Sequence, residues 1–269
     1  MIAVGVVGAC GRMGRVVCRA VAEQQDMRFV AAVDRSHVGE SVGKMVGDPA
    51  LDLVVSGALD ALLGSGAEVA VDFTHPDVVR DNIRWAVSHG LHVVVGTTGL
   101  TVDDHDDIAK QLAAEGSRSN VVACSNFAVG AALMQRFAAL GARYLPAAEV
   151  IELHHEGKAD APSGTAMATA RRIAAARDGR SGEVASRETV AGARGGEVEG
   201  IRVHSVRLPG LVAHQEVILG GLGQTLTIRH DSTDRTSFVP GVLLAVREVA
   251  GRPGLTVGLD TLLGFPEDT

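Results

Sequence analysis

The chain has 269 residues, of which 46% are hydrophobic, 21% are charged and only 3% are aromatic, and its formal net charge is −7 at pH 7. This length allows two domains with sizeable cores, and the scarcity of aromatics means that Ala, Val, Leu and Ile must build those cores. An acidic chain without a basic stripe or stacking aromatics is not expected to bind nucleic acid, so small molecules are the expected partners.

Short β-branched runs alternate with helical patterns from residue 2 to residue 125. Strands are predicted at residues 2–8, 28–34, 68–73, 91–96 and 120–125. Amphipathic segments lie between them, such as 76–90, which opens with Pro76 and closes at Gly90 as a capped helix does. This alternation of helices with nearly continuous apolar strands predicts an α/β fold with a Rossmann-type doubly wound parallel sheet.

The pattern changes after a predicted helix at residues 126–145. The expected elements are a strand at 148–155, an Ala-rich helix at 164–177, a long Gly-rich loop at 178–200, strands at 201–208, 213–220 and 224–230, and a helix at 238–250. Closely spaced strands separated by Pro and Gly are typical of an antiparallel meander, so this part is predicted to be an α+β domain with a mainly antiparallel sheet. The expected domains are 1–128 and 129–240, with a C-terminal segment, 241–269, that returns to the first domain.

The cysteines and the lack of a recognisable targeting signal indicate in which cellular compartment the protein is expected. Cys10, Cys18 and Cys124 are too few and too scattered for a disulfide framework or a zinc site of the Cys-x-x-Cys type, which favours a reducing environment. The N-terminus lacks a basic region, and no segment is long and apolar enough to span a bilayer. We therefore expect a soluble cytoplasmic protein with no membrane partner.

A glycine-rich turn follows the first predicted strand and opens the first helix, with Gly8, Gly11 and Gly14 at regular intervals. Close backbone approach and N–H groups at a helix N-terminus suit a pyrophosphate. The spacing departs from the strict dinucleotide fingerprint, so a purely structural turn is the alternative. Asp34, at the end of the second predicted strand, favours a dinucleotide because a carboxylate there accepts the ribose hydroxyls of NAD.

Side chains near this turn bear on which coenzyme binds. Arg35 follows Asp34 directly and is of the type that pairs with a 2′-phosphate, which suggests that both NADH and NADPH are accepted; a merely solvated arginine is the alternative. Cys10 is either a reactive thiol near a helix N-terminus or a small, silent residue. Arg12 lies in the same turn, where its guanidinium can also meet phosphate.

Two further strand ends carry polar or Gly-rich turns. Because ligands of open α/β sheets lie outside the carboxyl ends of the strands, these turns are expected to meet the nicotinamide end of the cofactor. Ordinary turn chemistry is the alternative. The residues are Gly96, Thr97 and Thr98 after the fourth predicted strand, and Ser125, Asn126 and Phe127 after the fifth.

The segment 151–166, IELHHEGKADAPSGTA, combines two histidines, a lysine and a helix start. On a strand His154 and His155 point to opposite faces, unless the strand ends between them. Lys158 is one of three lysines among 25 basic residues. Unlike arginine, lysine releases a proton at accessible cost, so a chemical role is indicated, with chance retention as the alternative.

The same segment predicts an anion site. Ser163, together with the N–H groups of Gly164 and Thr165, lies at the expected helix N-terminus, where a carboxylate is stabilised. A metal site made of the two histidines and Asp160 is the alternative. Adjacent histidines on a strand diverge, and no cysteine or HExxH companion is present, so we expect no metal.

The segments GACGRMG, VGTTG, SNFAVG, ELHHEGKADAPSGTA and AHQEVILGGLGQTLTIRHDSTDRTSFVPGVLLA resemble the bacterial dihydrodipicolinate reductases (4-hydroxy-tetrahydrodipicolinate reductases). The resemblance covers essentially the whole chain, and its HH-x-x-K-x-DAPSGTA block is highly specific. It implies NADH- or NADPH-dependent reduction of a cyclic dicarboxylate, 4-hydroxy-tetrahydrodipicolinate, to tetrahydrodipicolinate in lysine and diaminopimelate biosynthesis. It also implies a dinucleotide-binding first domain, a substrate-binding second domain and a homotetramer formed through the sheet of the second domain.

The resemblance also implies roles for individual residues. His154 matches the proton donor and Lys158 a second catalytic cation, and which of them gives the proton stays open. The expected substrate contacts are His155, Ser163, Gly164 and Thr165. The expected cofactor contacts are residues 8–13, Asp34, Arg35, 96–98 and 125–127. Glu156 and Gly157 replace a more basic pair of some members, which weakens the expected attraction for a dianion.

Other functions are compatible with the same two-domain pattern. An NAD(P)H-binding sensor would keep the first site without turnover, and a reductase of a different cyclic imine would keep both sites. A semialdehyde dehydrogenase would need an active-site thiol in the second domain, and no cysteine follows Cys124.

Overall fold

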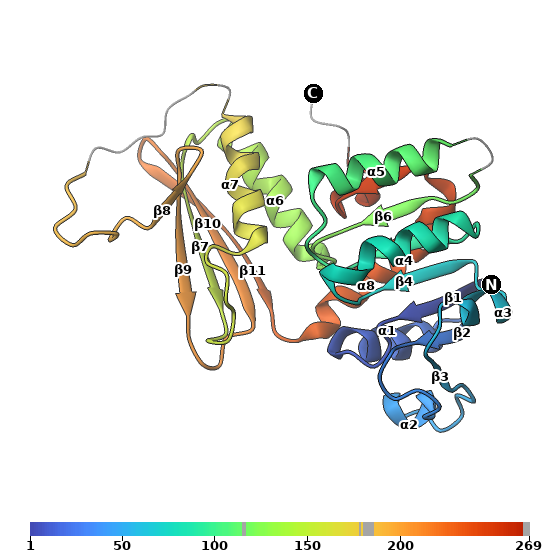
Figure 1. The fold of residues 1–269 in the computed structure, drawn as a ribbon. Helices are drawn as coiled ribbons and strands as arrows, with labels where there is room; N and C mark the ends of the chain where they lie inside the picture. Colours follow the sequence, from blue (N-terminus) through green and yellow to red (C-terminus); the bar gives the residue numbers. More distant parts are fainter. Residues whose placement is uncertain (115–116, 178, 180–185, 266–269) are drawn as a thin grey trace. The chain divides into compact units, whose positions relative to one another are not determined.

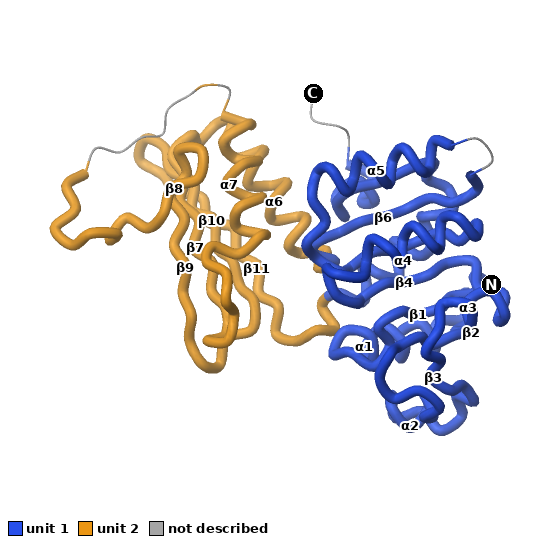
Figure 2. Tube along the Cα trace, in the orientation of Figure 1, with its two compact units in different colours: residues 1–127, 238–269 blue, residues 128–237 orange. Residues whose placement is uncertain are grey.

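The computed structural model describes residues 1–114, 117–177, 179 and 186–265. The chain divides into two compact units, which Figure 2 shows in different colours. Unit 1 comprises residues 1–127 and 238–269, and unit 2 comprises residues 128–237. Within the described part of the chain, no helix is both long and apolar enough to cross a membrane.

Unit 1 is built on a seven-stranded sheet in which every strand pair is parallel (Figure 1). The strand order is β12-β6-β5-β4-β1-β2-β3. The chain moves outward from β1 to β3 and then returns to the other side of β1 with β4, so the carboxyl ends of β1 and β4 border a switch point. This confirms the predicted doubly wound sheet. The strands are β1 (Ile2–Val7), β2 (Met27–Val33), β3 (Val55–Ser56), β4 (Val69–Asp72), β5 (His92–Val95), β6 (Val121–Ala123) and β12 (Leu255–Val257).

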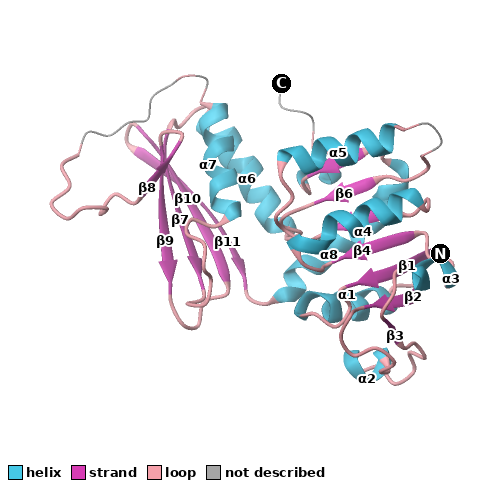
Figure 3. Ribbon diagram, viewed as in Figure 1, coloured by secondary structure: helices cyan, strands magenta, loops and turns pink. Residues whose placement is uncertain are grey.

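Helices cover both faces of this sheet (Figure 3). One face carries α1 (Arg12–Ala22) and α8 (Val239–Glu248), and the other carries α3 (Asp60–Gly64), α4 (Pro76–Ser88) and α5 (Val102–Ala113). The shorter elements are α2 (Val42–Val46), η1 (Arg235–Phe238), η2 (Val249–Gly251) and η3 (Asp260–Leu263).

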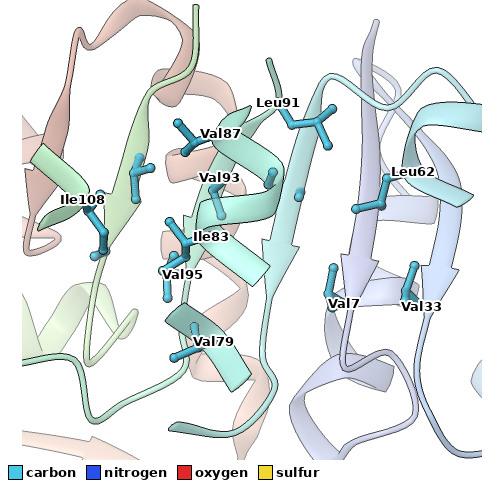
Figure 4. Close-up of a cluster of buried hydrophobic side chains, with 14 of the residues drawn as sticks. Val7, Val33, Leu62, Val79, Ile83, Val87, Leu91, Val93, Val95 and Ile108 are labelled. Atoms are coloured by element: carbon cyan, nitrogen blue, oxygen red, sulfur yellow. The ribbon is translucent and has the colours of Figure 1, made fainter. Parts of the chain in front are cut away.

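Local sequence signals explain where these helices begin and what they bury. Helix α4 starts with Pro76 after the His75 N-cap, and Thr101 forms a capping box with Asp104 at the start of α5. The core of this layer is aliphatic, with Leu62 and Ile83 fully buried among strand valines (Figure 4).

Unit 2 has a five-stranded sheet with α6 (Val129–Ala142) and α7 (Gly164–Ala176) packed on one face (Figure 3). The order is β11-β10-β7-β9-β8, and every pair is antiparallel except β7 with β9. This confirms the predicted α+β architecture with a mainly antiparallel sheet. The strands are β7 (Ala147–His154), β8 (Gly196–Val198), β9 (Ile201–Arg207), β10 (Ala213–Gly221) and β11 (Gln224–Ser232).

Strand β8 corrects the expected loop at 178–200. Its residues pair with β9 in an antiparallel hairpin in which Val198 faces Ile201. The connecting Glu199 and Gly200 both have positive φ, at 50° and 77°, which is the conformation that a tight two-residue hairpin turn requires. Residues 178 and 180–185 of the expected loop lie outside the described residues.

Candidate active site and coenzyme pocket

Unit 1 contains a pocket of about 670 Å³ at the carboxyl ends of β1, β2 and β4. This is the position at which doubly wound sheets hold a nucleotide. Five of the predicted cofactor residues line it: Gly8, Cys10, Gly11, Asp34 and Arg35. Side chains that were not predicted also line it, among them Phe73, Thr74, His75, Asp77 and Asn82.

The glycines of the first turn are required by close backbone packing. A Cβ on Gly8, which has a φ of 79°, would lie 2.5 Å from the carbonyl oxygen of Phe73. A Cβ on Gly14 would lie 2.0 Å from the carbonyl oxygen of Gly8. The turn therefore has no room for side chains at these two positions and leaves its backbone next to the pocket. A pyrophosphate at the N-terminus of α1 fits this arrangement.

Asp34 is bound to the same turn. Its Oδ2 accepts a hydrogen bond of 2.9 Å from the Cys10 N–H, and its Oδ1 accepts hydrogen bonds from the N–H and the hydroxyl of Ser36. Burial opposes ionisation of Asp34, but these hydrogen bonds outweigh it and hold the pKa of the carboxyl below its usual value. A carboxylate has about four lone-pair sites, so it keeps capacity for ribose hydroxyls.

The remaining predicted residues near this turn differ in exposure. Burial, with a smaller contribution from Asp34, raises the pKa of the Cys10 thiol, which keeps it protonated and favours a silent role over a reactive one. Arg12 is exposed at the first position of α1, and Arg35 is exposed at the pocket wall. Ala9 is fully buried and Met13 is half-buried.

The predicted turns after β5 and β6 are fixed by buried groups at neighbouring strand ends. Asp72, at the end of β4, is 2% exposed and accepts hydrogen bonds from Thr74, Asn82 and Thr97, the last at 2.9 Å. A Cβ on Gly96 would lie 2.1 Å from the ring of Phe73. That ring in turn packs against Phe127, with the two centroids 6.0 Å apart. Thr98 and Ser125 are exposed, and Asn126 is half-buried.

In unit 2 the predicted segment 151–166 runs from the end of β7 through a loop to the first turn of α7. Strand β7 ends at His154, so His155 lies beyond the strand and is exposed. Ser163 is the N-cap of α7, and its hydroxyl accepts a hydrogen bond of 3.2 Å from the Ala166 N–H. Gly164, the first residue of α7, is exposed, and a Cβ added to it would meet no atom within 4 Å.

His154 is held by the carboxylate of Glu152, which was not among the predicted site residues. Its Nδ1 lies 2.5 Å from Oε2 of Glu152, whose side chain is completely buried. Arg207 donates from Nη1 to one oxygen of Glu152 at 2.9 Å and from Nη2 to the other at 2.8 Å. The Ser163 N–H donates to Oε1 at 3.2 Å. These donors, with Ser205 as a further one, converge on one carboxylate that is removed from solvent.

A second ion pair lies in the loop between β7 and α7. Lys158 Nζ donates to Oδ1 of Asp160 at 2.7 Å, and Arg207 Nη2 donates to the carbonyl oxygen of Asp160 at 2.6 Å. Lys158 holds the pKa of the Asp160 carboxyl below its usual value. The loop lysine therefore binds the side chain of Asp160, and the β9 arginine binds the backbone of the same residue.

Burial lowers the pKa of His154, because it disfavours the charged imidazolium. Glu152 opposes this effect through its hydrogen bond and its charge, while the cations Lys158 and Arg207 add to it. The proton affinity of this imidazole is therefore set jointly by burial and by three neighbouring charges. Across the residues that the structure describes, no three His, Cys, Asp or Glu side chains are grouped to hold a metal ion.

Comparison with known families covers both units. The description "Dihydrodipicolinate reductase, N-terminus" matches residues 2–127, and "Dihydrodipicolinate reductase, C-terminus" matches residues 130–263. The chain belongs to the dihydrodipicolinate reductase family.

Relatives in this family align over nearly the full chain. The 4-hydroxy-tetrahydrodipicolinate reductase of Nocardia farcinica is 52% identical over 266 residues, which cover 97% of this chain and 98% of the relative. That of Cutibacterium acnes is 52% identical over 268 residues, which cover 98% of this chain and 100% of the relative. A solved structure, dipicolinate-bound dihydrodipicolinate reductase from Paenisporosarcina sp. TG-14, superposes with a TM-score of 0.84 at 38% identity, covering 97% of this chain and 99% of that one.

More distant structures share the fold. An amine dehydrogenase from Mycobacterium smegmatis has a TM-score of 0.66 at 15% identity, over 96% of this chain and 95% of that one. At this identity the likeness concerns the fold alone.

Proposed function

We propose that the chain catalyses the NADH- or NADPH-dependent reduction of 4-hydroxy-tetrahydrodipicolinate to tetrahydrodipicolinate, a step of lysine and diaminopimelate biosynthesis. The observation that carries the proposal is the site of unit 2. There His154, Lys158 and the N-terminus of α7 come from one short segment. His154 and the Ser163 N–H both contact the buried Glu152, and the charge of Lys158 acts on His154. A proton donor, a cation and an anion-binding helix start are what the reduction of a charged cyclic substrate needs.

In unit 2 the chain's own residues bind the substrate and supply a proton. The substrate carboxylates lie against Lys158, His155 and the N–H groups of Gly164 and Thr165, with Ser163 holding the start of α7 in place. The 4-hydroxyl group of the substrate leaves as water, and the resulting dihydrodipicolinate accepts the hydride together with a proton from His154 or Lys158, whose positive charge also offsets the negative charge of the substrate. Because α7 is 13 residues long, its N-terminus adds a favourable potential for a carboxylate.

In unit 1 the coenzyme is held by the glycine turn and by Asp34. Residues 8–13 take the pyrophosphate, Asp34 takes the ribose hydroxyls, and residues 96–98 and 125–127 take the nicotinamide end. When bound, the nicotinamide supplies the hydride. Arg35 stands beside Asp34 on the pocket wall, where it can pair with a 2′-phosphate, so we propose that both NADH and NADPH are used.

The assembly and the compartment belong to the same proposal. The family resemblance supports a cytoplasmic homotetramer formed through the sheet of unit 2. Free, buried Cys10, Cys18 and Cys124 are compatible with a reducing compartment.

The test is oxidation of NADH and of NADPH by the purified protein, with substrate generated from pyruvate and aspartate semialdehyde by a dihydrodipicolinate synthase. We expect turnover, and we expect His154→Ala to lower kcat by about 10² to 10⁴-fold, the usual worth of a positioned general acid. Coenzyme binding without turnover would point instead to a sensor or to another cyclic imine. An effect of His154→Ala below about threefold would remove His154 from the acid's role.

A further inference from the structure

We propose that Glu152 and Arg207 form a charge-neutral clamp that fixes the tautomer of His154 and sets the pH range in which it can donate a proton. Both are positioning residues, since they act through His154. The inference rests on the proposed function, because it takes His154 to be the proton donor. It goes beyond that function by assigning the task to two residues outside the HH-x-x-K-x-DAPSGTA block.

The clamp is defined by its hydrogen bonds. Each arm of the Arg207 guanidinium donates to a different oxygen of Glu152, at 2.9 and 2.8 Å, which is the bidentate arrangement that suits a carboxylate. The Glu152 side chain is fully buried, and that of Arg207 is 18% exposed. Burial opposes ionisation of Glu152, but the hydrogen bonds from Arg207, Ser205 and His154 hold its pKa below the usual value. Glu152 is therefore ionised at neutral pH, with its charge compensated.

The clamp determines which nitrogen of His154 carries the exchangeable proton. An ionised carboxylate only accepts hydrogen bonds, so the His154 Nδ1 that lies 2.5 Å from Glu152 must carry a hydrogen. Nε2 is then the nitrogen that gains and loses a proton, as for an imidazole oriented by a buried carboxylate. Without Glu152 the ring could protonate on either side, and part of the population would present the wrong nitrogen.

The charges around His154 act in opposite directions. Glu152 raises the histidine pKa, whereas Lys158 and Arg207 lower it. On the other neighbouring strand, β10, His154 faces the uncharged Ala213. Asp160 is already paired with Lys158. Removing the negative and the positive member of the clamp must therefore shift the titration of His154 in opposite directions.

The same strand offers a matched control. Glu149 lies three residues before Glu152 on β7 and therefore on the opposite face. It also pairs with a histidine and an arginine, with His204 at 2.8 Å and with Arg194. Glu149→Gln thus removes a carboxylate of the same type and with similar partners, from the same strand, without touching His154.

The experiment measures the pH profile of kcat for Glu152→Gln, Arg207→Gln and Glu149→Gln. Because the acid must be protonated, activity falls as pH rises through the pKa of His154. We expect Glu152→Gln to move this fall to lower pH and to lower kcat at pH 7 by about 10² to 10⁴-fold, as when an imidazole loses the carboxylate that fixes its tautomer. We expect Arg207→Gln to move it to higher pH and Glu149→Gln to leave it in place. Equal or same-direction shifts in the two clamp variants would overturn the proposal.

A second measurement needs no substitution within the clamp. Nitrogen NMR of the wild-type protein carrying labelled histidine, with His154 assigned through His154→Asn, reports which ring nitrogen is protonated in the neutral form. We expect the Nδ1–H tautomer, and an Nε2–H tautomer would refute the clamp even if Glu152→Gln fails to fold. Loss of activity in His154→Ala together with unmoved profiles in both clamp variants would refute the clamp alone. An active His154→Ala would refute the proposed function itself.

Discussion

Gly164→Ala tests whether the start of α7 binds the substrate or has only a structural role. Gly164 is the first residue of that helix, and a Cβ built on it would meet no atom within 4 Å. Its φ is not among the positive values, so alanine adopts the same backbone conformation without strain. The free protein should therefore be no less stable, because alanine is a better helix former than glycine by up to about 1 kcal/mol.

Under the proposed function, however, a methyl group in this open space weakens the binding of the substrate. A substrate carboxylate that accepts hydrogen bonds from the Gly164 and Thr165 N–H groups would occupy the space that the new methyl group takes. A hydrogen bond to a charged group contributes about 1.5 to 3 kcal/mol, and each 1.4 kcal/mol corresponds to a factor of ten. Losing one such bond should lower kcat/KM for the substrate by about 10- to 150-fold.

The assay combines substrate kinetics, thermal unfolding and titration with NADH. We expect Gly164→Ala to change kcat/KM for the substrate while the Tm and the affinity for NADH stay unchanged. Gly64→Ala is the matched control: Gly64 is also helical, in α3, and a Cβ there would likewise meet nothing within 4 Å. An unchanged kcat/KM in Gly164→Ala would refute a carboxylate at this helix start. A Tm lowered by several degrees would show that the position is structural.

Two further predictions concern the coenzyme pocket of unit 1. A Cβ on Gly14 would lie 2.0 Å from the carbonyl oxygen of Gly8, so Gly14→Ala must displace the turn, and we expect calorimetric titration to show NADH affinity reduced by about tenfold or more. Unchanged affinity would mean that the turn does not hold the pyrophosphate. Arg35→Ala should lower kcat/KM with NADPH by about tenfold or more but leave kcat/KM with NADH unchanged, because only the 2′-phosphate needs the guanidinium. Equal effects on the two coenzymes would leave Arg35 as a solvated side chain.

The architecture of unit 1 was predictable because its signals are local. The buried parallel strands are largely apolar, as in Val93, Val94 and Val95 of β5, and some of the following helices have their own start signal, such as Pro76 in α4. Strand β8 was missed for a different reason. β8 depends on a hairpin turn in which Glu199 adopts a positive φ, a conformation that glutamate rarely takes, so the sequence gives no hairpin signal there.

The segment around His154 and Lys158 was found because its residues follow one another in the chain. Glu152 was equally close in sequence, but a glutamate on a strand normally faces solvent, and nothing local indicates burial. Its burial depends on Arg207, which lies beside His154 through the parallel pairing of β7 with β9. That register is a tertiary property, set by the core that α6 and α7 bury against the sheet. Pattern analysis of the sequence cannot supply it.

The placement of Ser163 connects the two halves of the unit 2 site. It stays a predicted substrate contact, but its N–H already donates to Glu152 and its hydroxyl caps α7. The carboxylate that orients His154 therefore also fixes the first turn of the helix whose N-terminus is proposed to bind the substrate. Arg207 holds the intervening loop through the carbonyl oxygen of Asp160. Because one ion pair positions the proposed proton donor, the loop carrying Lys158 and the helix start, a substitution at Glu152 should disturb proton donation and carboxylate binding together, whereas Gly164→Ala should disturb only the second.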